Sequence, residues 1–159
     1  RRILLKNLLK ATVVLLLAAA CFSSARAEEG AKKFGIGIIL GEPAALDARY
    51  WISHDNAMDF NIGWGRSSFW LQGSYLWHNW SLINGTSDLD MPLYYGAGVF
   101  VGGGSGSAGF GVLGTIGLDF ILKKAPFDFF VELGPEAQIV SSGGLYFHGG
   151  IGARFYLPN

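Results

Sequence analysis

The chain has 159 residues and a formal net charge of +0, a length that suits one domain and excludes two ordinary ones. Charged residues make up only 15% of it, against roughly 25% in ordinary globular proteins. The 24 Gly residues and the 14% of aromatic residues are equally unusual for a soluble domain. Together these values favour a surface that does not face water.

The first 27 residues have the pattern of a Sec-type signal peptide. A basic region ending at Lys10 precedes the apolar stretch Ala11 to Ala20, and Ala25-Arg26-Ala27 forms a small-x-small cleavage site. An inner-membrane anchor is the alternative, but its uncharged stretch would be shorter than the roughly 20 residues that a spanning helix needs. We therefore expect a signal peptide at 1–27 and a single mature domain at 28–159.

Cys21 follows three alanines and so loosely resembles a bacterial lipoprotein cleavage site, although Leu is missing from its usual place. We expect Cys21 to leave with the signal peptide, with its lipidation as the alternative, so that the mature chain has no cysteine. Cleavage removes five of the twelve basic residues and none of the twelve acidic ones, leaving a formal charge of −5. That balance gives no support for nucleic-acid binding.

Beyond Glu28, apolar residues alternate with period two in short runs separated by Gly, Pro, Ser, Asn and Asp. Most runs have about 9–13 residues, close to the roughly 9–11 that a tilted strand needs to cross a bilayer. The pattern predicts an all-β fold, an eight-stranded antiparallel up-and-down transmembrane barrel. The expected strands are 33–41, 44–53, 57–65, 69–82, 92–103, 109–122, 127–139 and 145–157.

The last two runs show the alternation most clearly. From Leu145 to Leu157 every second residue is apolar or glycine, and in 127–139 all three charges fall on the face opposite Phe127. An open sheet edge in hydrocarbon leaves each unpaired backbone group costing several kcal/mol. We therefore expect the first run to pair with the last and close the barrel.

Alternation alone does not say which face points outward, since a soluble ligand-carrying barrel would invert the pattern. The polar faces are Gly-rich and hold only one or two charges per strand, too few for a soluble exterior. They suit the narrow interior of an eight-stranded barrel. Aromatic residues near the strand ends suit the interfacial girdles of a membrane barrel: Phe69, Trp77, Tyr95 and Phe127.

Several short motifs, in their order and spacing, look familiar together. They are Leu40-Gly41-Glu42-Pro43, Arg49-Tyr50-Trp51, Met58-Asp59-Phe60, Pro92-Leu93-Tyr94-Tyr95-Gly96, Phe130-Val131-Glu132-Leu133 after Ala125-Pro126, and Gly150 to Tyr156. The set resembles a widespread family of small bacterial outer-membrane proteins, similar in architecture to the OmpA and OmpX barrels. The resemblance covers nearly all of the mature chain and implies a structural or surface-exposed barrel without enzymatic activity, some of whose relatives bind host proteins.

The C-terminus is similar to the insertion signal that the barrel-assembly machinery reads. Gly152, Phe155 and Leu157 occupy the expected glycine and hydrophobic places. The chain departs from that signal by ending in Pro158-Asn159 rather than in an aromatic residue.

Charged residues on the polar faces are the candidate site. Isolated charges inside a narrow barrel are costly, so we expect them to pair, Arg154 with Glu132 or Glu136 and Arg49 with Asp59 or a nearby carboxylate. The resulting salt-bridge network would plug the lumen; a gated ion pathway and catalysis are the alternatives. The predicted lumen residues are Asp47, Arg49, Asp59, Asp119, Asp128, Glu132, Glu136, His148 and Arg154.

No catalytic residue, metal site or cofactor is predicted. A hydrolase needs a Ser beside a His with a supporting carboxylate, and no familiar hydrolase motif surrounds His54, His78 or His148. Three widely spaced histidines give no metal-ligand spacing. The pattern Gly109-x-Gly111-x-x-Gly114 follows no strand-to-helix turn, so we assign it to strand and turn glycines.

The sequence therefore predicts a non-enzymatic barrel of the bacterial outer membrane with a structural or adhesin-like role. The expected partners are outer-membrane lipid and lipopolysaccharide, the barrel-assembly machinery during insertion, and an extracellular or host protein, with no nucleic acid. We expect a monomer. A lipid A or lipopolysaccharide-modifying enzyme and a narrow channel are the alternatives.

Overall fold

The structure is a computed structural model that describes residues 32–64, 69–104, 107–140 and 143–158. The predicted signal peptide at 1–27 and Cys21 lie outside these residues. The regular elements of the described residues are β1 (Phe34–Glu42), β2 (Ala44–Trp51), β3 (Asn56–Trp64), β4 (Phe69–Asn79), β5 (Leu89–Asp90), β6 (Leu93–Gly104), β7 (Ser107–Leu122), β8 (Phe127–Val140) and β9 (Gly144–Tyr156). In the part of the chain that the structure describes, no helix is long and apolar enough to cross a membrane.

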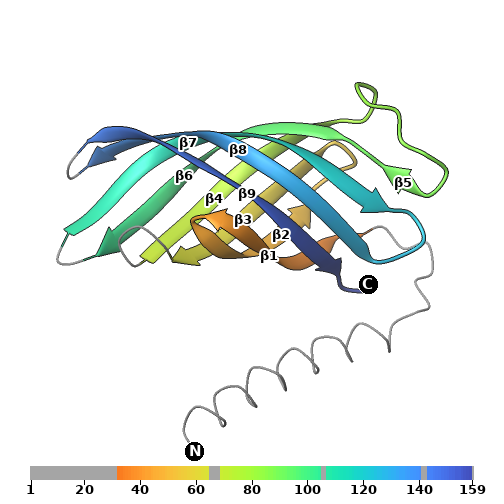
Figure 1. Ribbon diagram of the computed structural model, residues 1–159, viewed down its shortest axis with the longest axis horizontal. Helices are drawn as coiled ribbons and strands as arrows, with labels where there is room; N and C mark the ends of the chain where they lie inside the picture. The colour runs from red at the N-terminus through yellow and green to blue at the C-terminus, as the bar shows by residue number, and fades with distance from the viewer. Residues whose placement is uncertain (1–31, 65–68, 105–106, 141–142, 159) are drawn as a thin grey trace, which may run out of the picture. The chain divides into compact units, whose positions relative to one another are not determined.

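Eight long antiparallel strands close into a barrel. Each pairs with its neighbour along the chain, and β1 also pairs with β9 from Gly35 opposite Tyr156 to Glu42 opposite Gly149. Figure 1 shows this closure, with β1 in orange beside β9 in dark blue. The predicted all-β, eight-stranded barrel and the pairing of its first and last strands are confirmed.

The strand ends agree with the sequence prediction to within three residues. The difference is β5, a two-residue strand between the expected strands 69–82 and 92–103. It pairs with the end of β7, Leu89 opposite Leu122 and Asp90 opposite Ile121. Since β7 extends past the start of β6 at Leu93, its last residues lack a partner there, and β5 supplies one.

Side chains alternate between the lumen and the outer surface as the period-two pattern predicts. In β8, Asp128 and Glu132 are buried, whereas Phe129 is 52% exposed and Val131 40% exposed. In β9, Ile151 is 60% exposed and Arg154 only 1%. The prediction that the apolar faces point outward is confirmed, and the inverted arrangement of a soluble carrier is excluded.

The outer surface is a continuous apolar band around the barrel. All eight long strands contribute exposed large apolar side chains to it. Near its edge, Trp77 and Tyr95 stack with ring centroids 6.0 Å apart, and Phe69 is 51% exposed. Apolar surface left in water costs about 25 cal/mol per Å², so a band of this extent is suited to contact with lipid.

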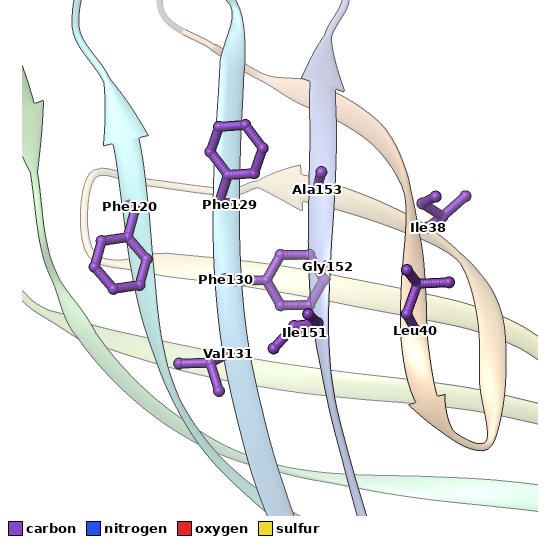
Figure 2. Close-up of a pocket in the computed structure, with 9 residues that line it drawn as sticks. All are labelled: Ile38, Leu40, Phe120, Phe129, Phe130, Val131, Ile151, Gly152 and Ala153. Carbon is purple, nitrogen blue, oxygen red and sulfur yellow. The ribbon is translucent and has the colours of Figure 1, made fainter. Parts of the chain in front are cut away.

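A shallow hollow of about 360 Å³ interrupts this band. Figure 2 shows that its lining comes from β1, β7, β8 and β9, with Ile38 and Leu40 on one side and Phe120 on the other. All nine lining residues are apolar or glycine, and Gly152 and Ala153 leave the space between the larger side chains. The hollow therefore offers nothing to a polar ligand.

Inside the barrel, large side chains lie over glycines of neighbouring strands. A Cβ atom at Gly152 would overlap the ring of Phe130, and one at Gly117 would overlap the ring of Tyr94. Phe130 and Tyr94 are buried. The inward glycines therefore make room for the aromatic rings that fill the narrow lumen.

Other glycines allow two strand backbones to approach closely, and two glycines of adjacent strands provide a matched test of this approach. A Cβ at Gly134 would collide with the backbone oxygen of Gly114, whereas a Cβ at Gly114 would meet only Gly96 and Pro135, at 3.8 Å. We expect Gly134→Ala to lower the free energy of unfolding by about 1–3 kcal/mol, because backbone must move to admit the methyl group. Gly114→Ala should change it by less than about 0.5 kcal/mol. Urea titrations of both variants in detergent check this, and equal effects would contradict the packing described here.

Candidate functional site: the charge network in the lumen

Two arginines from opposite ends of the chain meet in the lumen. Arg49 comes from β2 and Arg154 from β9, each at an inward position of its strand, and their exposed fractions are 0% and 1%. β2 and β9 are separated by β1 in the barrel. The two guanidinium groups therefore need several carboxylates around them.

Arg49 binds two carboxylates. Its Nε and Nη2 donate to the two oxygens of Asp59 at 2.6 and 2.7 Å, a bidentate pair. Its Nη1 donates to Asp119 Oδ2 at 2.5 Å. Asp59 lies directly opposite Arg49 in the β2–β3 register, whereas Asp119 comes from β7 across the lumen. Arg49 thus ties two sides of the barrel together.

Arg154 contacts four carboxylates. Its Nε donates to Asp47, and its terminal nitrogens lie 3.3 Å from Asp59, 3.4 Å from Asp119 and 3.4 Å from Asp128. Asp59 and Asp119 are therefore shared between the two arginines. The cluster joins side chains of β2, β3, β7, β8 and β9 in one network.

The predicted pairing of Arg154 with Glu132 or Glu136 is wrong, and the strand register gives the reason. The residue of β8 directly opposite Arg154 is Asp128, whereas Glu132 lies opposite Gly150 and Glu136 opposite Tyr146. At about 3.3 Å per residue, Glu132 and Glu136 sit progressively farther along the barrel. Glu132 instead accepts a hydrogen bond of 2.8 Å from the hydroxyl of Tyr94.

Aromatic rings complete the filling of the lumen around the charges. The Phe130 ring centroid lies 3.7 Å from the guanidinium carbon of Arg154, and the Tyr94 ring centroid 4.8 Å from that of Arg49. The Tyr156 hydroxyl donates to Asp128 at 2.6 Å. His78 Nε2 lies 3.2 Å from Asp119 Oδ2. The network is thus surrounded by aromatic rings and hydrogen-bond donors, and its charges are held in fixed hydrogen bonds.

A second polar group lies farther along the lumen. Thr115 Oγ1 is 3.2 Å from His148 Nε2, and Glu136 Oε1 is 3.4 Å from His148 Nδ1. A hydroxyl, an imidazole and a carboxylate in this order resemble a nucleophile, base and orienting acid. However, the cavity that His148 lines with Glu132 and Trp70 measures about 10 Å³, enough for about one water molecule. No substrate fits that cavity.

The structure places every predicted lumen residue inside the barrel, all of them buried. It divides them in two: Asp47, Arg49, Asp59, Asp119, Asp128 and Arg154 form the network, while Glu132, Glu136 and His148 lie beyond it. Sequence reasoning missed other lumen residues, among them His78, Tyr94, Thr115 and Tyr156. Strand parity could have found them, because His78 shares the inward face of β4 with Gln72 and Ser74.

No protein-family model matches the sequence, and no curated protein matches it either. Among solved structures, the chain is similar to the N-terminal β-barrel domain of Pseudomonas aeruginosa OprF, with a TM-score of 0.55. The similarity covers 78% of this chain and 95% of that chain at 14% sequence identity. At so low an identity, the similarity supports a shared fold and nothing further. The protein therefore has the eight-stranded, OmpA-like barrel architecture.

Proposed function

We propose that the protein is a non-enzymatic barrel of the bacterial outer membrane with a structural or surface-interaction role and a closed lumen. The observation that carries the proposal is the network of Arg49 and Arg154 with four aspartates. It spans the lumen from β2 to β7 and is at most 2% exposed. A lumen blocked in this way does not let solutes pass. The outer surface and the two ends of the barrel are therefore the parts that carry the function.

The apolar exterior supports insertion in a membrane, and the predicted signal peptide supports export to the outer one. An even number of strands puts both chain ends on one side, which in outer-membrane barrels is the periplasm. The connections near residues 41–44, 66–68, 102–109 and 141–144 would then face outward. An extracellular or host protein would contact these loops, while lipid and lipopolysaccharide would contact the apolar band.

Conductance measurements test the closed lumen. We expect planar bilayers that contain the folded protein to show no single-channel steps, because the buried charges hold one another and leave no water-filled path. A 16-stranded porin, whose lumen is an aqueous channel, serves as the positive control under the same conditions. Regular steps that scale with the amount of folded protein would overturn the proposal in favour of a narrow channel.

A lipid-modifying enzyme is the second candidate, and the arrangement of Thr115, His148 and Glu136 is the observation in its favour. The one-water cavity beside His148 weighs against it. Mass spectrometry of lipid A from cells that express the wild-type protein or Thr115→Val distinguishes the two proposals. We expect the same acyl pattern in both, and the same as in cells without the protein. A pattern altered by the wild type and restored by Thr115→Val would favour the enzyme.

A further inference from the structure

A cavity of about 550 Å³ opens at the barrel end that carries the C-terminus, β5 and the β7–β8 turn. None of the six charged residues of the network lines it; Tyr156, which does line it, donates to Asp128 of the network. The volume lies within the roughly 300–1,000 Å³ that small-molecule sites occupy.

One wall of this cavity is aromatic. Trp51 ends β2 and Trp80 follows β4, and their ring centroids are 5.9 Å apart. The ring of His54 lies 4.7 Å from that of Trp80. Two hydrogen bonds hold the wall in place: Trp51 Nε1 donates to the Tyr156 hydroxyl at 3.1 Å and Trp80 Nε1 donates to the backbone oxygen of His54 at 3.2 Å. The ring of Trp51 also packs on that of His78, with centroids 4.3 Å apart. Both indoles are therefore held in place and present part of their apolar surface to the cavity.

Cationic groups surround the opening. Lys32, Lys33 and Lys123 line it, against Asp90 as the carboxylate of the lining. Lys123 is paired with Asp90 at 2.9 Å, and Asp128 and Asp90 also act electrostatically on Lys32. Lys32 and Lys33 are the cationic groups of the lining outside the Lys123–Asp90 pair. Lys32 lies 5.7 Å from the centroid of the Tyr156 ring and donates to the backbone oxygen of Leu122. Burial lowers the pKa of Lys32, and an anion beside its ammonium group would offset that burial cost.

We propose that this cavity binds a small amphipathic organic anion, a carboxylate carried on a flat apolar body. The flat body would lie against Trp51 and Trp80, and the carboxylate would face Lys32 and Lys33. Aromatic walls also bind organic cations, but the two lysines would repel a cation here. The charge of the rim therefore decides the class of ligand, and the rings decide its shape.

Three probes that share one ring system test the proposal: 2-naphthoate, the neutral 2-naphthamide and the cation 2-naphthylmethylammonium. Isothermal titration of the folded, full-length protein in nanodiscs, with empty nanodiscs as the reference, measures their affinities. We expect naphthoate to bind at least tenfold more tightly than the amide, and the cation to bind no better than it does to empty nanodiscs.

Variants localise the binding. Lys33→Gln should weaken naphthoate binding about threefold, as expected for one partly exposed ion pair, and Lys32→Gln with Lys33→Gln should weaken it more than tenfold. Lys124→Gln is the matched control, because Lys124 lies next to Lys123 but pairs with Asp88 at 2.5 Å and does not line the cavity. Trp80→Leu removes part of the aromatic wall and its hydrogen bond to the His54 backbone but no charge, so it should weaken the anion and the amide by the same factor.

Three results would overturn the proposal. The amide could bind as tightly as the carboxylate, the lysine variants could match Lys124→Gln, or the heat could equal that of empty nanodiscs. A gel-shift comparison of heated and unheated samples verifies that each variant is folded before titration. The outcome is independent of the closed-lumen proposal, which rests on conductance.

Discussion

Replacing Arg154 by Met is expected to lower the free energy of unfolding by about 3–5 kcal/mol, the cost of breaking a buried ion pair by removing one partner. Arg154 contacts Asp47, Asp59, Asp119 and Asp128. Without its guanidinium, Arg49 alone would face all four carboxylates. Urea titration in detergent or lipid vesicles, followed by the gel shift between folded and unfolded forms, measures the loss.

Further variants separate the loss of the Arg154 charge from the loss of its side-chain packing. Met keeps much of the side-chain volume beside Phe130, so the lost charge dominates. Adding Asp47→Asn and Asp128→Asn to Arg154→Met should recover at least half of the lost stability, because the two amides no longer need a cation. Lys124→Met, on the exposed β7–β8 turn, is the control and should stay within about 0.5 kcal/mol. If Arg154→Met proved as stable as this control, the network would not hold the barrel together.

A positive charge on the outer face is the second change with a large expected effect. Ile151→Arg, at a 60% exposed position in the body of β9, should cost about 2–4 kcal/mol of stability in lipid, as arginine does near the midplane of a bilayer. The same change at Leu157, just past the end of β9, should cost no more than about 1 kcal/mol, because the side chain reaches the interface. Unfolding of both variants from liposomes measures the difference.

This pair of variants tests the membrane assignment directly. In water, arginine on an exposed strand position would be neutral or would improve solubility. Equal stability of Ile151→Arg and the wild type in lipid, together with detergent-free solubility of the monomer, would contradict a lipid-facing exterior. Gly73→Ala, where the added Cβ meets only the Phe60 ring at 3.7 Å, controls for substitution within the barrel wall.

The sequence by itself determined the strands, their inward and outward faces and the burial of the charges. Period two is a local property, because successive residues of a strand point to opposite faces whatever the partner strand is. The same parity identified Asp119, Asp128 and Arg154 as lumen residues. The sparse charges and the abundant apolar residues of the other face then determined which side meets lipid.

Apart from the pair of Arg49 with Asp59, which the sequence already suggested, only the tertiary structure decided which charges meet. Arg154 faces Asp128 rather than Glu132 because of the register between β8 and β9, and Asp119 reaches both arginines because closure brings β7 across from β2. Register and closure depend on pairings between distant segments, and a change of two residues in register leaves every side chain on its own face. Period two therefore cannot detect such a change. The aromatic and lysine-lined cavity has the same origin, since residues between Lys32 and Tyr156 meet there only once the barrel is closed.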